Sequence, residues 1–585
     1  MTPTKPTNPH ETHLIHQLLD TFLREDIGNI RTKSTLEHHH DGPWLRRTLT
    51  PTTDLLIPVQ PTQFMCQWRT RPTHPRTDPG PHITTYPHLL TTITPLLDND
   101  TRNGLTTLAT ECANHLTTTH IHDTTQHTLH HHLTTTHGPD TSTWYGPHAS
   151  LAFDALAART PHPVYPTSHA RTGLTPHHIH KYAPETAPHI HLHWLALPTE
   201  TLTTNPGAAT PSRTDIPGLA PHETALPIHP LTIGPHLTNA LTETGLTTAH
   251  LLHTPGPETI PTLSLRTLAL TTNPLTHLKL PINTATLGNR NTRTITPGSL
   301  TDTATGHQLI QHIATTTNNH HILHANEQGY AHANHPLLAC LARQLPTTIT
   351  NSLVLPLAAL TATTPTGRLV IDDLADRHTN GNHTTLLTTL WDTLLTWHIT
   401  LLDHGIALES HQQNISLVID PPTHTPHPNH TTLPSGHHIR LLYKDNDSPR
   451  IYTPHLHQHL TPPHHPTFND PRITAHTPQQ LTDMFTTITL HLCCAAPAIH
   501  LEHTGRLTPG TSLPLLREHL EKATNTITNP HTQNLIRTHI LNAPTHPIKA
   551  MLTAGTLLPK HRTRHHASDI NKYYLPAPNY LTTTP

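Results

Sequence analysis

The chain has 585 residues and a formal net charge of −3, and only 12% of its residues are charged. This length exceeds the needs of one hydrophobic core, so we expect two or three subdomains. The near-neutral charge argues against the basic surface of a nucleic-acid-binding protein. No run approaches the roughly 20 apolar residues of a membrane span, and the start lacks a secretory signal pattern. We therefore expect a cytoplasmic protein with no nucleic-acid or membrane partner.

Histidine is unusually abundant, with 65 His beside 61 Pro, and both are spread along the whole chain. Such uniform bias is typical of compositional drift. A histidine-rich metal-binding protein remains an alternative, because neutral imidazole binds zinc, nickel and copper, yet there is no HExxH and no mixed Cys/His ligand set. The five cysteines fit neither a disulfide framework nor a metal knuckle, and we expect Cys493 and Cys494 to be buried on a helix.

The first part of the chain shows two elements with clear periodicity. HETHLIHQLLDTFLRED, residues 10–26, has the apolar spacing of an amphipathic helix. PHIHLHWLAL, residues 188–197, alternates as a half-buried strand does. The stretch 199–223, rich in Thr, Pro and Gly, predicts a loop or insertion. Otherwise, the organisation of the first 140 or so residues is only weakly legible.

The second half of the chain has clearer secondary-structure patterns. Residues 383–405 predict a long buried helix that ends at Gly405. Residues 406–420 and 438–445 predict a hairpin whose two arms carry polar residues, joined by a Pro/His-rich loop. TPQQ at 477–480 has Thr, Pro and Gln where a helix begins, and a largely helical C-terminal region follows. Since there is neither a βαβ rhythm nor a repeat, the predicted fold class is α+β.

Four polar clusters follow one another along the chain. They are Ser264–Thr267 (SLRT), Lys279–Pro281 leading into Thr286–Arg290 (KLP, TLGNR), Glu409–Asn414 (ESHQQN) and Tyr443–Asn446 (YKDN). Their order resembles the NRPS-independent siderophore (NIS) synthetase family of the aerobactin-synthetase type, with its SxRT, KLP/S…TxxxR, ExHxQN and YRDN-like motifs.

The resemblance extends from about residue 150 to the C-terminus, where a ferric-reductase-like region is expected. Arg171–Leu174 and Tyr182–Glu185 are similar to the family's HPxHPxxKxRxGF…YSPE block, and Leu226–Pro230 looks like its HPWQ segment.

The resemblance implies an ATP-dependent ligase. A carboxylic acid, such as citrate, a related polycarboxylate or a succinylated intermediate, attacks the α-phosphate of ATP. An amine or hydroxyl then captures the acyl-adenylate to form an amide or ester. Citrate and ATP bring about seven negative charges into one cleft, which several cationic side chains and Mg²⁺ must offset. ATP would be bound without a P-loop, because neither GxxxxGK[ST] nor GxGxxG is present.

Residue roles are carried over from the matched motifs. The expected catalytic residues are His411, Arg290 and Arg266; the substrate-binding residues are Ser264, Thr286, Arg290 and Gln413; the ATP-binding residues are Lys279, Arg171, His169 and Asn414; and the metal ligands are Glu409 and Asp445. No enzyme nucleophile is required, because the adenylate is the activated species.

The upstream block departs from the family pattern. His169 stands where the family has Lys, and Tyr165 stands where it has its second His. An imidazole is mostly uncharged at neutral pH, so a catalytically weakened paralogue is a further alternative. The intact SxRT, TxxxR and ExHxQN motifs favour an active enzyme. The resemblance also implies a homodimer and a cupped-hand arrangement of a thumb (1–145), a fingers core (146–380) and a palm (381–585) that is mostly helical after its hairpin.

Overall fold

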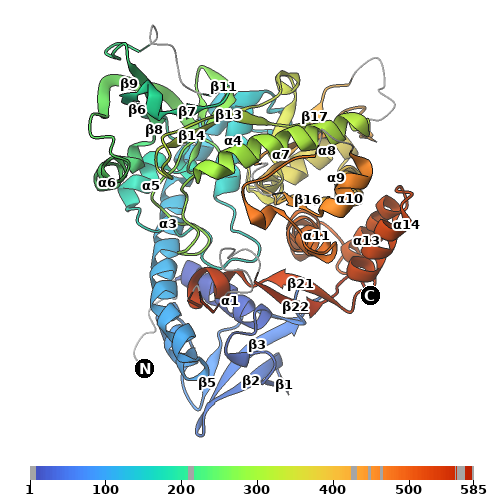
Figure 1. Ribbon diagram of the computed structural model, residues 1–585. Coiled ribbons are helices and arrows are strands. Elements are labelled where there is room, and N and C mark those ends of the chain that lie inside the picture. The colour runs from blue at the N-terminus through green and yellow to red at the C-terminus, as the bar shows by residue number, and fades with distance from the viewer. Residues whose placement is uncertain are drawn as a thin grey trace.

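The computed structural model describes residues 8–208, 216–422, 431–445, 449–460, 465–559, 561–562 and 573–582. It mixes helices with several sheets whose strands are mostly antiparallel (Figure 1), and the predicted α+β class is confirmed.

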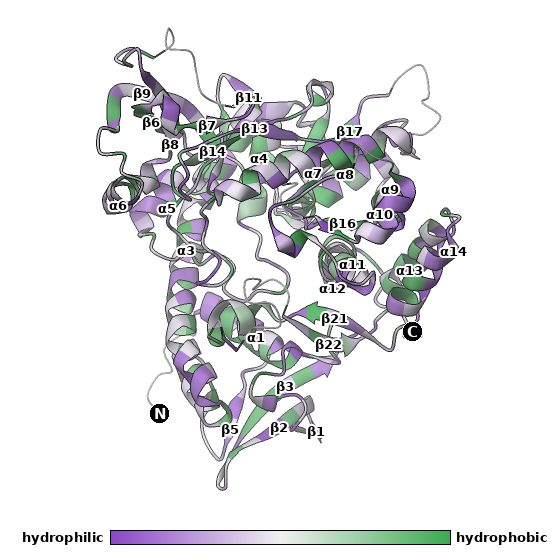
Figure 2. Cartoon of the chain, viewed as in Figure 1, coloured by the Kyte–Doolittle hydropathy of each residue, from purple (hydrophilic) through white to green (hydrophobic). Residues whose placement is uncertain are grey.

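The N-terminal region is a small sheet covered by helices. The predicted N-terminal helix is confirmed as α1 (Pro9–Arg24); Asn8 caps its start and its apolar face is buried. The central residues of β3 are also apolar and buried (Figure 2). The other elements are β1 (Thr35–His39), β2 (Gly42–Thr50), β3 (Thr53–Pro61), β4 (Trp68–Thr70), β5 (Arg76–Asp78), α2 (Tyr86–Ile93) and the 39-residue α3 (Asn99–His137). In Figure 1, α3 runs along one side of the molecule, from this sheet to the next.

The largest sheet has eight antiparallel strands in the order β7-β13-β14-β11-β10-β9-β6-β8. The strand expected at 188–197 is confirmed as β6 (Ile190–Pro198). Thr267, at the start of β10, pairs with Lys279, at the end of β11, which brings the SLRT and KLP motifs to one edge of the sheet. The other bounds are β7 (Thr203–Thr204), β8 (Glu223–Ile228), β9 (His250–Pro261), β10 (Thr267–Leu270), β11 (Asn273–Lys279), β13 (Asn326–His332) and β14 (Ala339–Gln344).

Helices surround this sheet and join it to the rest of the chain. They are α4 (Pro147–Ala158), α5 (Pro176–Tyr182), α6 (Pro235–Glu243) and α7 (Pro297–Thr316). Part of the stretch predicted as a loop at 199–223 is the short strand β7, and residues 209–215 within it lie outside the described residues.

A second sheet has the order β12-β19-β17-β15 and contains the predicted hairpin. Strands β17 (Ile415–Asp420) and β19 (His438–Tyr443) are antiparallel, as expected. The polar residues, however, do not lie on the two arms: Glu409–Asn414 precede β17 and Asp445 follows β19, so both groups lie at the open end of the hairpin. Asn446 lies outside the described residues. The remaining bounds are β12 (Ile322–His324), β15 (Leu353–Pro356), β16 (Ile406–Ala407), β18 (Thr431–Thr432) and β20 (Arg450–Ile451).

The long buried helix is confirmed as α9 (His383–Asp403), and Gly405 beyond it has a φ of 75°. The helix expected at 477 begins two residues later as α11 (Gln479–Met484); Thr477 offers no side-chain cap, and Gln480 instead accepts a hydrogen bond from the amide of His476. The other helices are α8 (Val370–Thr379), α10 (Thr453–His459), α12 (Ala496–His503), α13 (Ser512–Thr524) and α14 (Pro530–Ile536).

One described stretch, Gln479–His503, is long and apolar enough to cross a membrane, contrary to the expectation from sequence. Its most apolar window is 89% buried inside the fold, which is the behaviour of a core helix. Cys493 and Cys494 lie within it as buried free thiols, as expected. The chain then returns to the N-terminal region through the paired strands β21 (Thr545–Lys549) and β22 (Tyr574–Pro578).

Candidate active site

One cavity of about 990 Å³ lies where α1, α3, the edge of the large sheet, the open end of the hairpin and the C-terminal segments meet. It is lined by all the predicted site residues but one, Arg290. These are Ser264, Arg266, Lys279, Thr286, His169, Arg171, Glu409, His411, Gln413, Asn414 and Asp445. Clusters that are up to 276 residues apart in the chain thus face a single space.

Asp445 is held by two cations from the large sheet. Its Oδ1 accepts hydrogen bonds from Lys279 Nζ at 2.6 Å and from Arg343 Nη2 at 2.5 Å. Burial alone would raise the pKa of Asp445, but the charges of Arg343 and Lys279 outweigh burial and hold the pKa well below its ordinary value. Arg343 also donates to the buried Glu327. No motif in the sequence indicated Arg343, because it lies inside the apolar strand β14.

The loop after β11 places Arg293, not Arg290, in the cavity. Arg293 donates to Thr286 Oγ1 from Nε at 2.7 Å and again from Nη2. Burial, followed by the neighbouring charges of Arg266 and Arg171, lowers the pKa of Arg293 to about 9, so it is still a cation at neutral pH. Arg290 points elsewhere and donates to the carbonyl of Ala554 at 3.0 Å. The only sequence signal for Arg293 was a second arginine in the same run.

The ESHQQN segment is a turn closed by its own hydrogen bonds. The amide of His411 donates to the carbonyl of Glu409, and the amide of Asn414 donates to the carbonyl of His411 at 2.8 Å. Asn414 Nδ2 donates to the Glu409 carbonyl at 3.3 Å, and the amide of Gln413 donates to His411 Nδ1 at 3.3 Å. These bonds fix the turn so that the side chains of Glu409, His411 and Gln413 line the cavity.

His169 of the altered upstream block lies against two histidines of α3, His115 and His122. His169 stacks on His115 with ring centroids 5.2 Å apart and meets the edge of His122 at 4.7 Å. Burial lowers the pKa of His169 well below its ordinary value, that of His122 to about 3 and that of His115 to about 4. The three rings are therefore neutral at pH 7. The nearby positive charges are those of Arg159 and Arg171. Arg171 Nη2 donates to the buried Glu185 at 2.5 Å.

A magnesium ion would have to use few protein ligands here. Within the described ranges, no three His, Cys, Asp or Glu side chains lie close enough together to hold a metal ion. Mg²⁺ is commonly held by one or two carboxylates together with substrate phosphates. Of the two predicted ligands, Glu409 suits this better, because Asp445 Oδ1 already accepts from two cations.

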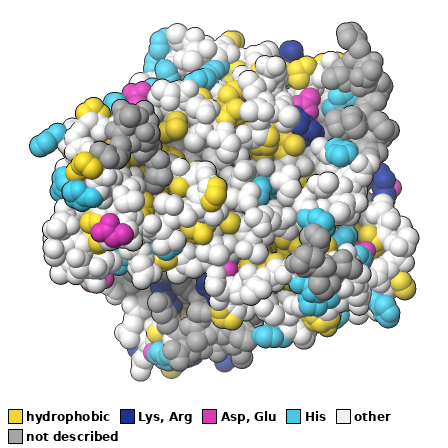
Figure 3. All heavy atoms as spheres, turned by 45° about the horizontal axis from the view of Figure 1, so that its top comes forward, with side chains coloured by type: hydrophobic (Ala, Val, Ile, Leu, Met, Phe, Trp, Pro, Cys, Tyr) yellow, Lys and Arg dark blue, Asp and Glu magenta, His cyan; other side chains and the backbone are white. Residues whose placement is uncertain are grey.

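Surface histidines are scattered over the face seen in Figure 3 and do not gather into one patch.

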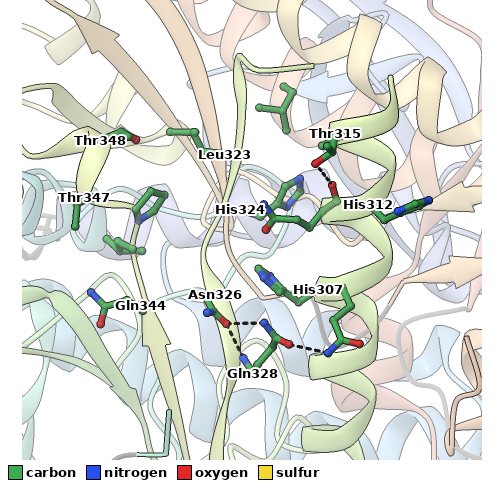
Figure 4. A pocket seen from close by; sticks show the side chains of 16 residues that line it. His307, His312, Thr315, Leu323, His324, Asn326, Gln328, Gln344, Thr347 and Thr348 are labelled. Atoms are coloured by element: carbon green, nitrogen blue, oxygen red, sulfur yellow. Dashed lines mark hydrogen bonds between the residues drawn. The ribbon is translucent and has the colours of Figure 1, made fainter. Parts of the chain in front are cut away.

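A second cavity, of about 800 Å³, lies between α7 and the strands β12 to β14 (Figure 4). Its lining residues include His307, His312, Asn326, Gln328 and Gln344, and there is no Lys, Arg, Asp or Glu among them. Among its lining side chains, Gln308 Nε2 donates to Gln328 Oε1 at 2.7 Å, and Gln328 Nε2 donates to Asn326 Oδ1 at 3.3 Å. The described lining therefore lacks the cationic side chains that bind polyanions elsewhere.

The comparisons with known proteins agree with the family resemblance of the motifs that line the cavity. Residues 151–362 match the model of the IucA / IucC family, and no curated protein gives a significant match. The petrobactin biosynthesis protein AsbB from Bacillus anthracis str. Sterne superposes with a TM-score of 0.74 at 16% identity, covering 98% of this chain and 95% of that one.

Two aerobactin synthetases from a hypervirulent pathotype of Klebsiella pneumoniae have the same fold. ATP-bound IucA gives a TM-score of 0.65 at 16% identity, covering 98% of this chain and 99% of its own. IucC gives 0.66 at 18% identity, covering 98% of both chains. The ferric-reductase-like character of the C-terminal region stays a prediction. The comparisons therefore relate residues 151–362 to the IucA / IucC family, and the fold over nearly the whole chain to that of AsbB, IucA and IucC.

Proposed function

We propose that the chain is an ATP-dependent siderophore-biosynthesis synthetase, which adenylates a carboxylic acid and condenses it with an amine or a hydroxyl. The observation that carries this proposal is the gathering of cationic side chains around His411 in one cavity. The cations that line this cavity are Arg159, Arg171, Arg266, Lys279, Arg293 and Lys549. Among the described lining residues, the acidic groups are Asp123, Glu409 and Asp445. The lining therefore favours an acid and a triphosphate that must approach each other despite their charges.

The reaction needs two displacements and no enzyme nucleophile. An oxygen of the substrate carboxylate attacks the α-phosphorus, and pyrophosphate leaves. The nitrogen or oxygen of the second substrate then attacks the acyl carbon, loses its proton to solvent or a nearby base, and AMP leaves. Arg266 and Arg293 would orient carboxylate and phosphate oxygens by paired hydrogen bonds. His411 would stabilise the charge that develops on the α-phosphate, and bound Mg²⁺ would neutralise part of the phosphate charge.

Several finer assignments belong to the same proposal. Citrate is the first acid to test, because three carboxylates match several cations. ATP is proposed as cosubstrate, with Lys279, Arg171 and Asn414 among its contacts and with Glu409 and Asp445 as the magnesium candidates. A homodimer in the cytoplasm, with thumb, fingers and palm subdomains, is proposed from the family. The neutral imidazole at His169 keeps a weakened paralogue as the second candidate, since it removes a charge from the site.

The proposal is tested by trapping the adenylate with hydroxylamine. Purified protein given ATP, Mg²⁺ and hydroxylamine should form a hydroxamate and release pyrophosphate when citrate, 2-oxoglutarate or a succinylated diamine is added. His411→Ala should abolish the signal without lowering the melting temperature, whereas His38→Ala, on the exposed surface, should leave it intact. A folded protein that is silent with every acid would refute the synthetase assignment.

A further inference from the structure

The chain segment Lys549–Leu557, here called the C-terminal segment, lies against the N-terminal region. It leaves the end of β21 and forms the π-helical turn Thr553–Leu557. Leu552 and Leu557 are buried in the core built by α1, α2 and α3. Hence the N-terminal core includes residues from the other end of the chain. None of the sequence motifs predicted this contact.

Two buried carboxylates hold the C-terminal segment. Glu25, at the end of α1, accepts hydrogen bonds from the amides of Leu552 at 3.1 Å and Thr553 at 2.8 Å, and from Thr553 Oγ1 at 2.7 Å. Glu111, in α3, accepts from Thr556 Oγ1 at 2.9 Å. Both glutamates are almost inaccessible to solvent, and burial raises the pKa of each. Donors on these oxygens offset the cost of burying them.

Glu111 also contacts two segments that line the cavity. Its carboxylate accepts from Tyr165 Oη at 2.8 Å and Thr167 Oγ1 at 3.0 Å, within the altered upstream block. It accepts from the amide of Asn289 at 3.1 Å, in the loop that carries Thr286. One side chain therefore ties α3, the upstream block, the 286–290 loop and the C-terminal segment together.

Direct contacts keep the loop and the C-terminal segment together. A Cβ placed on Gly288 would lie 2.9 Å from Gly555 Cα, so the two backbones touch. Beside this contact, Arg290 Nη1 donates to the carbonyl of Ala554. The residue expected to bind substrate thus fixes the position of the C-terminal segment instead.

The C-terminal segment brings a cation into the cavity. Lys549 and Met551 line it, and Lys549 Nζ lies 4.0 Å from Glu409 Oε1, at the limit of an ion pair. Burial lowers the pKa of His162 to about 3, with smaller contributions from His411, Arg24 and Lys549. Lys549 therefore lies beside Glu409, in the turn that also carries His411.

We propose that Lys549 contacts the anionic substrate beside His411, and that Glu111 is a positioning residue that acts through the C-terminal segment. The proposal rests on the proposed function for the identity of the substrate. The positioning part rests on the contacts alone.

The first test replaces the cation. Lys549→Ala should lower kcat/KM for acid-dependent hydroxamate formation by roughly 10- to 100-fold, as expected for one lost charge-assisted contact, with an unchanged melting temperature. Lys522→Ala is the matched control, because Lys522 is a surface residue paired with Asp392, and it should be fully active. Full activity of Lys549→Ala would overturn the contact.

The second test is a double-mutant cycle. Glu111→Ala should lower kcat/KM in the parent protein but add little in the Lys549→Ala background, and it should speed amide hydrogen exchange over residues 549–557. Glu111→Gln should retain most activity, because the hydroxyls around it can turn to donate or accept. Additive losses, or unchanged exchange, would overturn the positioning role.

The two proposals fail in distinguishable ways. If the parent protein forms no hydroxamate with any acid, the proposed function falls, while hydrogen exchange in Glu111→Ala still decides the positioning. Substrate contact is then decided by labelling with acetic anhydride: citrate and ATP should protect Lys549 from acetylation but leave Lys522 reactive. Equal labelling of Lys549 with and without these ligands would overturn the contact.

Discussion

Residue spacing alone does not decide which of the two arginines, Arg290 or Arg293, faces the cavity. Both arginines follow Thr286 in one loop, and the TxxxR pattern selects Arg290. In the structure the loop turns at Leu287 and Gly288, which have φ values of 55° and 108°. This turn directs Arg290 to the carbonyl of Ala554 and leaves Arg293 to contact Thr286 inside the cavity.

The two arginines should therefore respond differently to substitution. Arg293→Ala should lower kcat/KM by about 100-fold, since it removes a cation from the cavity. Little of this loss should come from unfolding of the protein. Arg290→Ala should destabilise the protein by about 1 kcal/mol through its lost hydrogen bond and should reduce activity less. Steady-state kinetics and urea unfolding of both variants measure this. The opposite ranking would restore Arg290 as the substrate contact.

At the scale of elements, α3 is the helix that the sequence predicted least clearly. Its 39 residues are rich in Thr and His and have no strong apolar stripe. Asp98 caps its start by accepting from the amide of Thr101 at 2.8 Å. Threonines along it, such as Thr117, donate to the carbonyl four residues earlier, a bond that competes with helix formation rather than favouring it. Contacts with α1, α2 and the C-terminal segment therefore sustain the helix.

Gly104 of α3 offers a test of that packing. Alanine is the better helix former by about 1 kcal/mol, but a Cβ at residue 104 would lie 2.3 Å from the carbonyl oxygen of Leu557. Gly104→Ala should thus destabilise the protein by about 1 to 3 kcal/mol, as overpacking does. Thermal unfolding measures the change.

The control for this substitution is Gly298, in the first turn of α7. The nearest atom to a Cβ there would be Asn469 Cβ at 3.9 Å, so Gly298→Ala should be neutral or stabilising. Equal stability of the two variants would mean that the α3 contact with the C-terminal segment is loose.

For the whole molecule, the abundance of histidine has a consequence for stability. Burial lowers the pKa of several histidines to about 3: His122, His162, His229, His277, His398 and His491. The unfolded chain, with a histidine pKa near 6.5, binds more protons than the folded chain below that pH. Stability is therefore fully present above pH 6.5 and is lost as the pH falls toward the folded-state values.

The expected size of this effect is large. From pH 7 to pH 6 each such histidine costs about 0.7 kcal/mol, and together they cost about 4 kcal/mol. Since typical stabilities are about 5 to 15 kcal/mol, we expect cooperative acid unfolding between about pH 5 and 6. Urea unfolding at pH 7 and 6, with circular dichroism as the signal, measures it. A fold that persists unchanged at pH 4 would contradict the buried neutral state of these rings.

The amino-acid sequence by itself determined the local elements and the polar motifs. Amphipathic periodicity defined α1, β6 and α9, because those faces are buried against a core. The SLRT, KLP and ESHQQN motifs identified residues that line one cavity, because the sequence specifies the charge and hydrogen-bonding groups of each side chain.

Tertiary structure decided which of these groups meet. It placed Arg293 rather than Arg290 in the cavity and Arg343 beside Asp445. It also placed Lys549 beside Glu409, on a segment whose Leu552 and Leu557 are buried in the N-terminal core. These contacts join residues that are far apart in the chain. Local periodicity does not predict these contacts, because they depend on how complete sheets and helices pack. They also depend on which hydrogen-bond donors lie near each buried carboxylate.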